Sequence, residues 1–513
     1  MKTNQVGVYR VRGMEAYGAL QAPFAPDAEY PELRAGAGRA PENFVFREFR
    51  EFLRTLGWDA EWFGTAAWNP LGWLIRPGAT VVLKPNLVVS EHPEGDRIVR
   101  YTDTDGPIIR CIGEYVLRAL EGRGTIIIGD SPIKETDFAK ATGLTGIDRV
   151  ADALRGRGAS VELVDFRDFV SRRDEVAMVD GRAQSGDPRG YSAFDLGGRS
   201  ELEEVSASSA RFRSTAAYYE NRMPETHAPG RHRYSVANSV LQADVFINVP
   251  KLKTHCKAGI TVALKNLVGI CNEKRWLPHH RKGSPEQGGD EYAEQTAAGV
   301  KLVERLKDFF VQNPIGKVFY PRIMLLNKLG KRVLGIDIIR RIRNSDPYQN
   351  GGWYGNDTVW RMVLDLNKIL RYGQAGGTLS ATPLRRALTI VDGLWAGELE
   401  GPLKPAPKVA GVFLAGVDSL ALDVVAATLM GFDYRKIKLL ARGLGVSQLP
   451  LSDVRPEDIE VLSNDAAWSD LVGIGRQHLA FVPPRGWRGH IELTEPAAPA
   501  GRARRRPEPV GAA

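Results

Sequence analysis

The residues that could carry chemistry lie in a lysine-rich run between residues 248 and 270, NVPKLKTHCKAGITVALKNLVGI. The run follows an apolar, strand-like stretch and gathers its cations and proton carriers within fifteen residues: Lys251, Lys253, His255, Lys257 and Lys265. Ammonium groups bind phosphate or carboxylate, and an imidazole or a buried amine can move a proton beside them. The run therefore predicts a site that holds a small anion and does proton chemistry next to it.

Side chains two residues apart on an extended segment point to the same side. The members of the run that would share a face in this way are Lys251, Lys253, His255 and Lys257. We expect these lysines to anchor the anion, either His255 or Lys265 to transfer the proton, and Asn266 to add a neutral donor. The competing interpretation is a basic loop followed by a solvated helix face.

Polar or charged residues follow every predicted strand. They are Lys84, Asn86, Asp130, Asp165, Lys251, Asp392 and Asp418. Open parallel sheets bind ligands beyond the carboxyl ends of their strands, so these residues would meet in one crevice if the strands are parallel. We expect Lys84 and Asn86 to contact the substrate there. A single Asp after a strand is more often a turn former, so the prediction depends on the convergence.

Asp130 and Asp392 are the acidic candidates, as ligands of a divalent cation or as a base opposing the lysines. Asp130, in GDSP, could instead orient a lysine or cap the next helix, and Asp392 could belong to a glycine-rich turn. His279 and His280 are weaker metal candidates, because their spacing matches no standard zinc pattern. The GxGxxG, GxxxxGK[ST] and GxSxG signatures are absent.

The elements that would position these residues alternate between strands and helices. Short β-rich runs predict strands at 80–84, 124–129, 160–166, 243–249, 386–393 and 411–418. Helical spacing predicts helices at 105–120, 147–154 and 419–432, the first capped by Asp105 with Pro107 in its first turn. This alternation indicates parallel β-α-β units. We predict an α/β fold with a Rossmann-like, mostly parallel sheet and two large insertions.

At 513 residues the chain exceeds a single typical core. We expect an N-terminal extension at 1–79, an α/β core at 80–435 with insertions at about 170–235 and 271–377, a C-terminal segment at 436–493 and a disordered tail at 494–513. Residues 319–343 combine apolar and basic residues at helical spacing, which suits a membrane-surface or partner helix or, more commonly, a helix packed on its own domain.

Charge and cysteine content limit the function classes. The net charge is +8, but 61 acidic residues are mixed among 69 basic ones, so we expect no nucleic-acid partner. Three cysteines without zinc or ferredoxin spacing predict no intrinsic iron–sulfur cluster and fit a cytoplasmic location. We also expect neither a signal peptide nor a transmembrane segment.

Several motifs together resemble one family. They are VVLKPNLV at 81–88, GDSP at 129–132, the run at 248–270, IVDG at 390–393, GPL at 401–403 and LAGVDSLALDVVAATLMGF at 414–432. On these the chain is identified as a member of the domain of unknown function 362 family. Its members are largely uncharacterised, so the resemblance assigns no role to the matching positions, which are Lys84, Asn86, Asp130, Lys251, Lys253, His255, Lys257, Lys265, Asn266, Asp392 and Asp418.

Many members of that family carry a ferredoxin-like iron–sulfur domain, which implies low-potential redox chemistry in those cases. This chain lacks the CxxCxxCxxxCP segment, so a redox role would require an external ferredoxin or another bound cofactor.

We therefore hypothesise an enzyme that acts on a small anionic metabolite, phosphorylated or carboxylated, in a crevice at the strand ends. A divalent metal is one candidate cofactor. The alternatives are a redox protein and a non-catalytic protein that binds a membrane or polymer surface through residues 319–343. The sequence leaves the reaction and the oligomeric state open.

Overall fold

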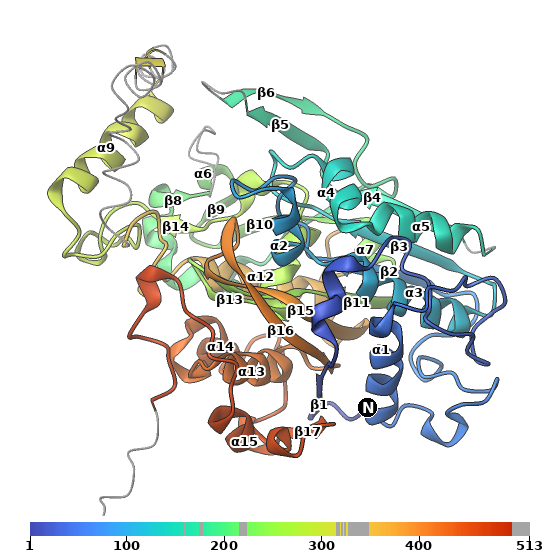
Figure 1. The fold of residues 1–513 in the computed structure, drawn as a ribbon. Helices are drawn as coiled ribbons and strands as arrows, with labels where there is room; N and C mark the ends of the chain where they lie inside the picture. The colour runs from blue at the N-terminus through green and yellow to red at the C-terminus, as the bar shows by residue number, and fades with distance from the viewer. Residues whose placement is uncertain are drawn as a thin grey trace, which may run out of the picture.

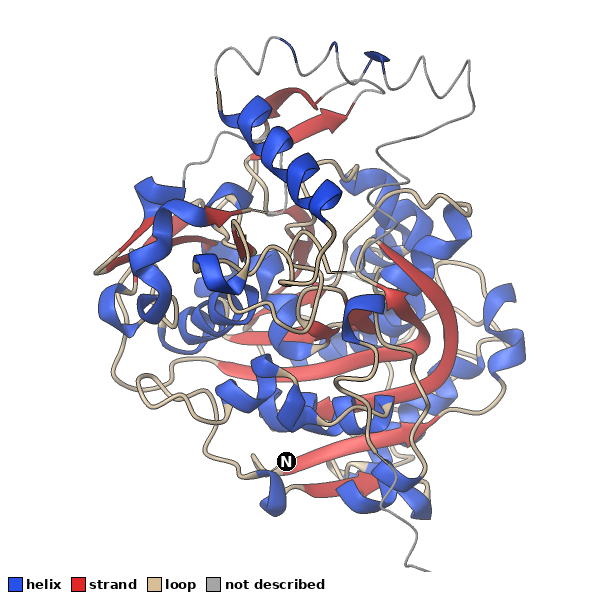
Figure 2. Cartoon of the chain, turned by 90° about the vertical axis from the view of Figure 1, so that its left-hand side faces the viewer, coloured by secondary structure: helices blue, strands red, loops and turns tan. Residues whose placement is uncertain are grey.

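The computed structural model describes residues 1–157, 160–173, 178–214, 223–313 and 348–494, together with residues 319, 322, 325 and 326. A ten-stranded sheet crosses the molecule (Figure 1), and helices lie on both of its faces (Figure 2). The predicted amphipathic segment at 319–343 and the predicted tail at 494–513 fall, but for single residues, outside the described part of the chain.

Five neighbouring strands of the sheet are parallel. Their spatial order is β4 (Ser160–Asp165), β3 (Thr125–Asp130), β2 (Thr80–Pro85), β11 (Val245–Val249) and β15 (Arg386–Glu400). Numbered along the chain, the order is 3-2-1-4-5, which is that of a doubly wound Rossmann sheet with its topological switch between β2 and β11. The predicted Rossmann-like, mostly parallel α/β fold is confirmed.

Strands from both ends of the chain complete the sheet. β16 (Lys404–Gly416) returns antiparallel to β15, β1 (Gln5–Arg10) pairs antiparallel with β16, and β17 (Glu460–Ser463) pairs parallel with β1. Beyond Pro250, β12 (Lys251–His255) takes the place of β11 beside β15, and β13 (Gly259–Thr261) folds back on it. The lysine run thus extends the sheet at the carboxyl ends of the parallel strands.

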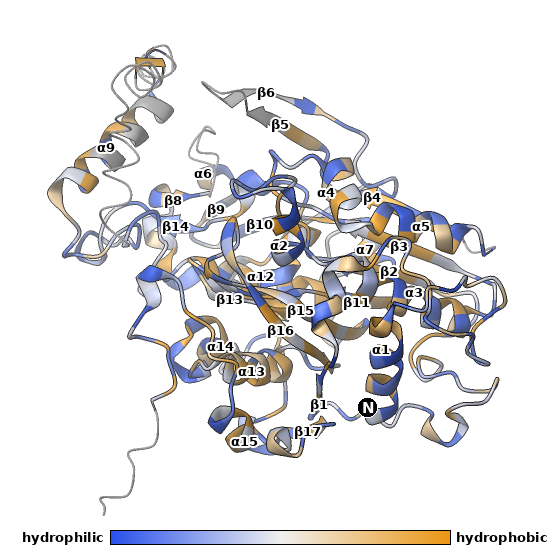
Figure 3. Cartoon of the chain, viewed as in Figure 1, coloured by the Kyte–Doolittle hydropathy of each residue, from blue (hydrophilic) through white to orange (hydrophobic). Residues whose placement is uncertain are grey.

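The strands form because their β-branched residues pack on both sides. Val82 and Ile127 join one apolar core, whereas their neighbours Val81 and Ile126 join the other, as the two-residue period of a strand requires. Figure 3 shows orange, hydrophobic stretches along the central strands and both colours along α1. A sheet that is buried on both faces has room for polar side chains at the ends of its strands, and the candidate site lies at their carboxyl ends.

Helices cover the two faces. One face carries α1 (Phe44–Thr55), α3 (Gly106–Leu120) and α5 (Ile147–Arg155), and the other carries α8 (Ala263–Asn266), α12 (Val359–Tyr372) and α13 (Ser419–Met430). The predicted cap of α3 is present, since the Asp105 carboxylate accepts from Gly106 N and Pro107 lies in the first turn. α3 therefore begins directly after the polar segment 102–105.

The segments between these elements form smaller units. The first insertion contains the hairpin of β5 (Phe169–Arg173) and β6 (Met178–Ala183) and a small sheet of β7 (Tyr191–Asp195), β10 (Arg231–Ala237) and β9 (His227–Ala228). The second contains α9 (Ala298–Gln312), which stands away from the sheet in Figures 1 and 2. The remaining short elements are α2 (Val99–Thr102), α4 (Phe138–Thr145), β8 (Phe212–Arg213), α6 (Met223–Thr226), α7 (Asn238–Leu241), β14 (His280–Arg281), α14 (Lys438–Gly443) and α15 (Leu471–Arg476).

One expected member of the crevice lies elsewhere. Because β16 is antiparallel to β15, its last residue, Gly416, pairs with Thr389 near the start of β15. Asp418 therefore lies at the opposite edge of the sheet from Asp392, and the prediction that it joins the crevice is wrong. Its carboxylate accepts from Leu420 N and Ala421 N and caps α13.

Among the described residues, no helix combines the length and the apolar composition that crossing a bilayer requires.

Candidate active site

A buried ion pair joins the ends of β2 and β3. Lys84 Nζ lies 2.7 Å from Asp130 Oδ1 and also donates to Asn266 Oδ1 at 3.1 Å. The second oxygen of Asp130 accepts from Leu87 N at 2.6 Å. Burial lowers the pKa of the Lys84 ammonium, although Asp130 acts in the opposite direction. Of the alternatives for Asp130, the structure has it orient a lysine, and Asn266 is bound to the same lysine.

A glycine makes this pair possible. A side chain at Gly269 would collide with the Asp130 carboxylate and the Lys84 ammonium, so the turn after α8 can pass only without a Cβ. Ser131 fixes the same turn, because its amide donates to Gly269 O and its hydroxyl to Cys271 O. The GDSP motif and the lysine run are therefore packed directly on one another.

A second buried pair joins β12 to β15. Lys251 Nζ lies 2.7 Å from Asp392 Oδ2, and neither side chain is exposed. The same oxygen of Asp392 accepts from Asp105 N at 2.9 Å. Burial raises the pKa of the Asp392 carboxyl, and Lys251 opposes that shift. The pair satisfies both charges within the protein, which leaves the anion to other lysines.

Lys253 and Asp103 form a looser pair. The Lys253 ammonium donates to Thr102 O, while Asp103 Oδ1 accepts from Val88 N at 3.0 Å and Val89 N at 3.4 Å. Burial, opposed by Asp103, lowers the pKa of Lys253 to about 7. Burial, opposed by Lys253, raises the pKa of Asp103 to about 7. Both groups can therefore change their protonation state near neutral pH.

Lys265 has the most unusual amine in the site. It lies in α8 and is only 8% exposed, and within the described residues its ammonium makes no hydrogen bond or ion pair. Burial, followed by the nearby cations Lys274 and Lys257, lowers its pKa to about 7. Lys274 is itself partly buried, and burial lowers its pKa to about 8. With a pKa of about 7, about half of the Lys265 amines are neutral at pH 7, which suits a general base.

Two histidines face the same lysines. His255 Nδ1 accepts from Lys257 N at 3.0 Å and Ala258 N at 3.2 Å, so its proton is assigned to Nε2. His279 Nδ1 lies 2.8 Å from Leu277 O. Burial and then the surrounding lysines hold the pKa of both imidazoles well below the usual value. At neutral pH both rings are neutral, and the Nε2–H group of His255 is available to donate a hydrogen bond.

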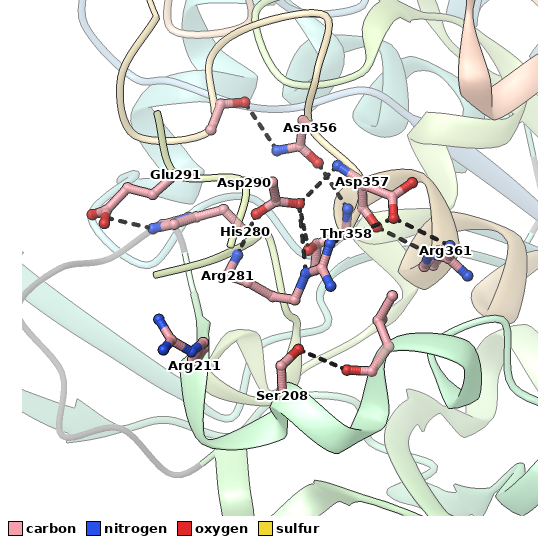
Figure 4. A network of polar contacts seen from close by, with 12 residues as sticks. Ser208, Arg211, His280, Arg281, Asp290, Glu291, Asn356, Asp357, Thr358 and Arg361 are labelled. Carbon is pink, nitrogen blue, oxygen red and sulfur yellow. Dashed lines mark hydrogen bonds and ion pairs between the residues drawn. The ribbon is translucent and has the colours of Figure 1, made fainter. Parts of the chain in front are cut away.

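Lys257 leads from this site to a neighbouring network. Its ammonium is 3.2 Å from His280 Nδ1, and His280 Nε2 is 3.9 Å from Glu291 Oε1. Figure 4 shows His280 and Glu291 beside a cluster centred on Asp290, whose carboxylate accepts from Thr358 Oγ1 at 2.6 Å and Asp357 N at 2.7 Å. This cluster braces the segment that carries the two histidines.

A hollow of about 460 Å³ adjoins the cluster. Its lining includes Arg281, Asp290, Trp353, Tyr354, Asp357 and Lys438. The charged groups pair with one another, since Asp357 lies 3.4 Å from Arg281, 3.2 Å from Arg361 and 3.6 Å from Lys438. Burial would raise the pKa of the Asp357 carboxyl, but Arg361 and Lys438 bring it below the usual value. The arrangement stabilises this wall and leaves no charge for a ligand among the groups named.

The predicted metal ligands are not grouped. Within the described ranges, no three His, Cys, Asp or Glu side chains are arranged to hold a metal ion. Asp130 and Asp392 are each bonded to a lysine, and His279 and His280 face Leu277 O and Lys257.

The structure brings together most of the predicted residues. Lys84, Asp130 and Asn266 form one contact group, Lys251 and Asp392 a second, and His255, Lys257 and Lys265 a third that Lys253 adjoins. Asn86 lies beside the first group, and its backbone nitrogen donates to Thr104 Oγ1 at 2.7 Å. Asp165, at the end of β4, is bonded to Arg167 instead.

Three residues of the candidate site were not predicted from the sequence. Asn248 accepts from Asn266 Nδ2 at 2.8 Å, Lys274 adds its charge beside Lys265, and Asp103 faces Lys253. A signal exists for Asp103, because the segment TDTDG at 102–106 precedes a capped helix and follows a strand end. Polar residues there belong to the carboxyl edge of the sheet.

Fold and site together define a class: a Rossmann-like α/β protein whose carboxyl edge is built from buried lysines, carboxylates and neutral histidines. The sequence profile described as "Domain of unknown function (DUF362)" matches residues 167–428, about half of the chain, and the chain belongs to this family. The match begins after β4. Lys84 and Asp130 therefore lie outside it and contact it through Asn266 and Gly269.

The other comparisons add little. No curated protein matches the chain. A crystal structure of a protein from Thermotoga maritima is similar over 71% of this chain at 11% sequence identity, with a TM-score of 0.28, and the chain spans about half of that protein, 54% of its length.

Proposed function

We propose that this protein is an enzyme that binds a small phosphorylated or carboxylated metabolite and transfers a proton to or from it. Lys257 and Lys274 lie close enough to Lys265 to lower its pKa, and all three lysines lower the pKa of His279. Such a concentration of positive charge in a buried site is compensated when an anion binds. His255 donates a hydrogen bond to the anion. Lys84 and Lys251, which the sequence suggested as substrate contacts, stabilise the fold through their ion pairs instead.

The observation that carries this proposal is the buried amine of Lys265, which has no bonding partner among the described residues and a pKa of about 7. The buried lysines that serve stability in this site, Lys84 and Lys251, are each paired with a carboxylate. Lys265 can instead alternate between a neutral base and a charged acid at physiological pH. We therefore assign the proton transfer to Lys265 rather than to His255.

Sulfate tests the anion site, because its charge is constant between pH 6 and 9. Calorimetry should detect sulfate binding to the wild-type protein that weakens as the pH rises through about 7, where Lys265 loses its proton. Lys265→Met should reduce the affinity about tenfold. Lys436→Met, at an exposed surface lysine, is the matched control and should bind like wild type.

Turnover is tested with a pool of phosphorylated and carboxylated metabolites in deuterated water. Mass spectrometry should find one of them consumed or labelled with solvent deuterium by the wild type but not by Lys265→Met. A pool that the wild type changes no more than the variant does would contradict the assignment of an enzyme.

A further inference from the structure

Lys253 and Asp103 carry the next inference. Both side chains are fully buried, Lys253 in β12 and Asp103 just before α3. The Lys253 ammonium donates to the carbonyl oxygen of Thr102, the residue before Asp103, so the two groups are neighbours. No hydrogen bond joins them within the part of the chain that the structure describes, and no protein group there bridges them.

The carboxylate has bonding capacity left. Asp103 Oδ1 holds the amides of Val88 and Val89, but Oδ2 is buried and has no partner among the described residues. An unpaired buried carboxylate oxygen costs folding free energy, so such an atom calls for a ligand or a bound water that supplies the missing bond.

Two more unpaired oxygens belong to the same surroundings. Thr261 is the direct partner of Lys253 between β13 and β12, which puts both side chains on one face, and its Oγ1 is buried without a described partner. Asn86 is held beside Asp103 by two hydrogen bonds with Thr104: the backbone nitrogen of Asn86 donates to Thr104 Oγ1, and Thr104 N donates to Asn86 O. The side-chain Oδ1 of Asn86 is also buried and has no partner among the described residues. Among the described residues, three separate segments thus each leave a buried oxygen unpaired around Lys253 and Asp103.

The chemistry of a bridging group follows from its two neighbours. It must accept a hydrogen bond from the Lys253 ammonium and donate one to the Asp103 carboxylate. A hydroxyl does both, whereas a carbonyl cannot donate, and an ammonium cannot accept and would be repelled by Lys253.

We propose that the substrate is a hydroxylated anion whose hydroxyl lies between Lys253 and Asp103 while its carboxylate or phosphate lies among Lys257, Lys265 and Lys274. The substrate class is a hydroxy acid or a hydroxyalkyl phosphate. This inference rests on the proposed function and narrows it.

Matched pairs of ligands test it by calorimetry at a pH just below 7. Glycerate is compared with propionate, and glycerol 3-phosphate with propyl phosphate, so that only the hydroxyls differ within a pair. The wild type should bind the hydroxylated member about tenfold more tightly in at least one pair, as hydrogen bonds to charged groups allow. The pair that shows the difference identifies the anion.

Variants locate the hydroxyl. Asp103→Asn keeps one oxygen for the amides of Val88 and Val89 but replaces Oδ2 by a group that cannot accept, so both members of a pair should bind alike. Thr261→Val, of similar volume, should reduce the preference about threefold and serves if Asp103→Asn does not fold. Asp365→Asn, at a buried aspartate bonded to Ser200 and Tyr234, is the control and should keep the preference.

The outcomes separate the two proposals. Equal binding within both pairs by the wild type overturns the hydroxyl inference and leaves the anion site standing. Binding of none of the four ligands overturns both. A preference that persists in folded Asp103→Asn and Thr261→Val places the hydroxyl elsewhere and also overturns the inference.

Discussion

The amine of Lys265 owes its properties to its surroundings rather than to its residue type. Burial and the nearby cations Lys274 and Lys257 lower its pKa, so that a group normally charged at neutral pH becomes one that titrates there. Lys84 and Lys251, equally buried, each have a carboxylate within 2.7 Å. The absence of such a partner among the described residues distinguishes Lys265 from these two lysines.

This difference predicts a pH dependence of stability. The pKa of Lys265 is about 7 in the folded protein and 10.5 for an ordinary lysine. Between these values the unfolded chain binds the proton and the folded chain does not, so the free energy of unfolding rises with pH. Lys265→Met should therefore be more stable than wild type at about pH 6, on the order of 4 kcal/mol, with the difference vanishing near pH 10.5.

Denaturant unfolding of both proteins over this pH range measures the effect. The same measurement on Lys436→Met should reproduce the wild-type slope. A wild type and Lys265→Met variant with parallel pH profiles would show that the amine is not held at a lowered pKa.

Gly269 provides a second prediction. Gly269→Ala places a methyl group against the Asp130 carboxylate and the Lys84 ammonium and should separate the pair. Breaking a buried ion pair costs about 3 kcal/mol in the free energy of unfolding. Gly198→Ala, where a Cβ would meet no atom within 4 Å, should cost far less in the same urea titration. A similarly small loss in the free energy of unfolding for both variants would mean that the backbone at residue 269 can shift to accommodate a methyl group without separating the ion pair.

At the scale of elements, the strand ends explain which predictions succeed. Short β-branched runs locate β2, β3, β4 and β11 within one or two residues, and their parallel pairing brings Lys84, Asp130 and Lys251 to one edge as expected. Strand direction is not encoded in such a run. A hairpin and a crossover begin with the same pattern, which is why the antiparallel β16, and with it Asp418, could not be placed from the sequence.

The same limit applies to individual site residues. The lysines of 251–265 stand out because they alternate on an extended segment, but their division into paired and unpaired amines depends on carboxylates far away in the chain. Asp103 and Lys274 become significant only through contacts with Lys253 and Lys265, which no local pattern contains.

Asp418 offers a prediction at this scale. Asp418→Ala removes the cap of α13 and should lower the free energy of unfolding by about 1 kcal/mol. Sulfate affinity should stay unchanged, because the helix begins at the edge of the sheet opposite the lysines. Loss of sulfate binding in a variant that remains folded would instead return Asp418 to the site.

For the whole molecule, the first strand is as important as the core that the motifs mark. β1 lies between β16 and β17, and its Val6 and Val8 are completely buried. Deleting residues 1–12 should expose β16 as an unpaired edge and lower the melting temperature sharply, with aggregation visible by size-exclusion chromatography. Lys2→Ala, at an exposed side chain before the strand, is the control. An unchanged melting temperature for the deletion would show that β1 is dispensable.

The pairing of Lys251 with Asp392 also bears on how the protein is made. The two residues are 141 positions apart, and β15, which carries Asp392, leaves the ribosome after all four other parallel strands. Until Asp392 has been synthesised, Lys251 has no carboxylate with which to form the ion pair that accompanies its burial. Synthesis must therefore pass residue 392 before the carboxyl ends of the parallel strands can be completed, and a nascent chain stalled before that residue contains every lysine of the site without being able to assemble it.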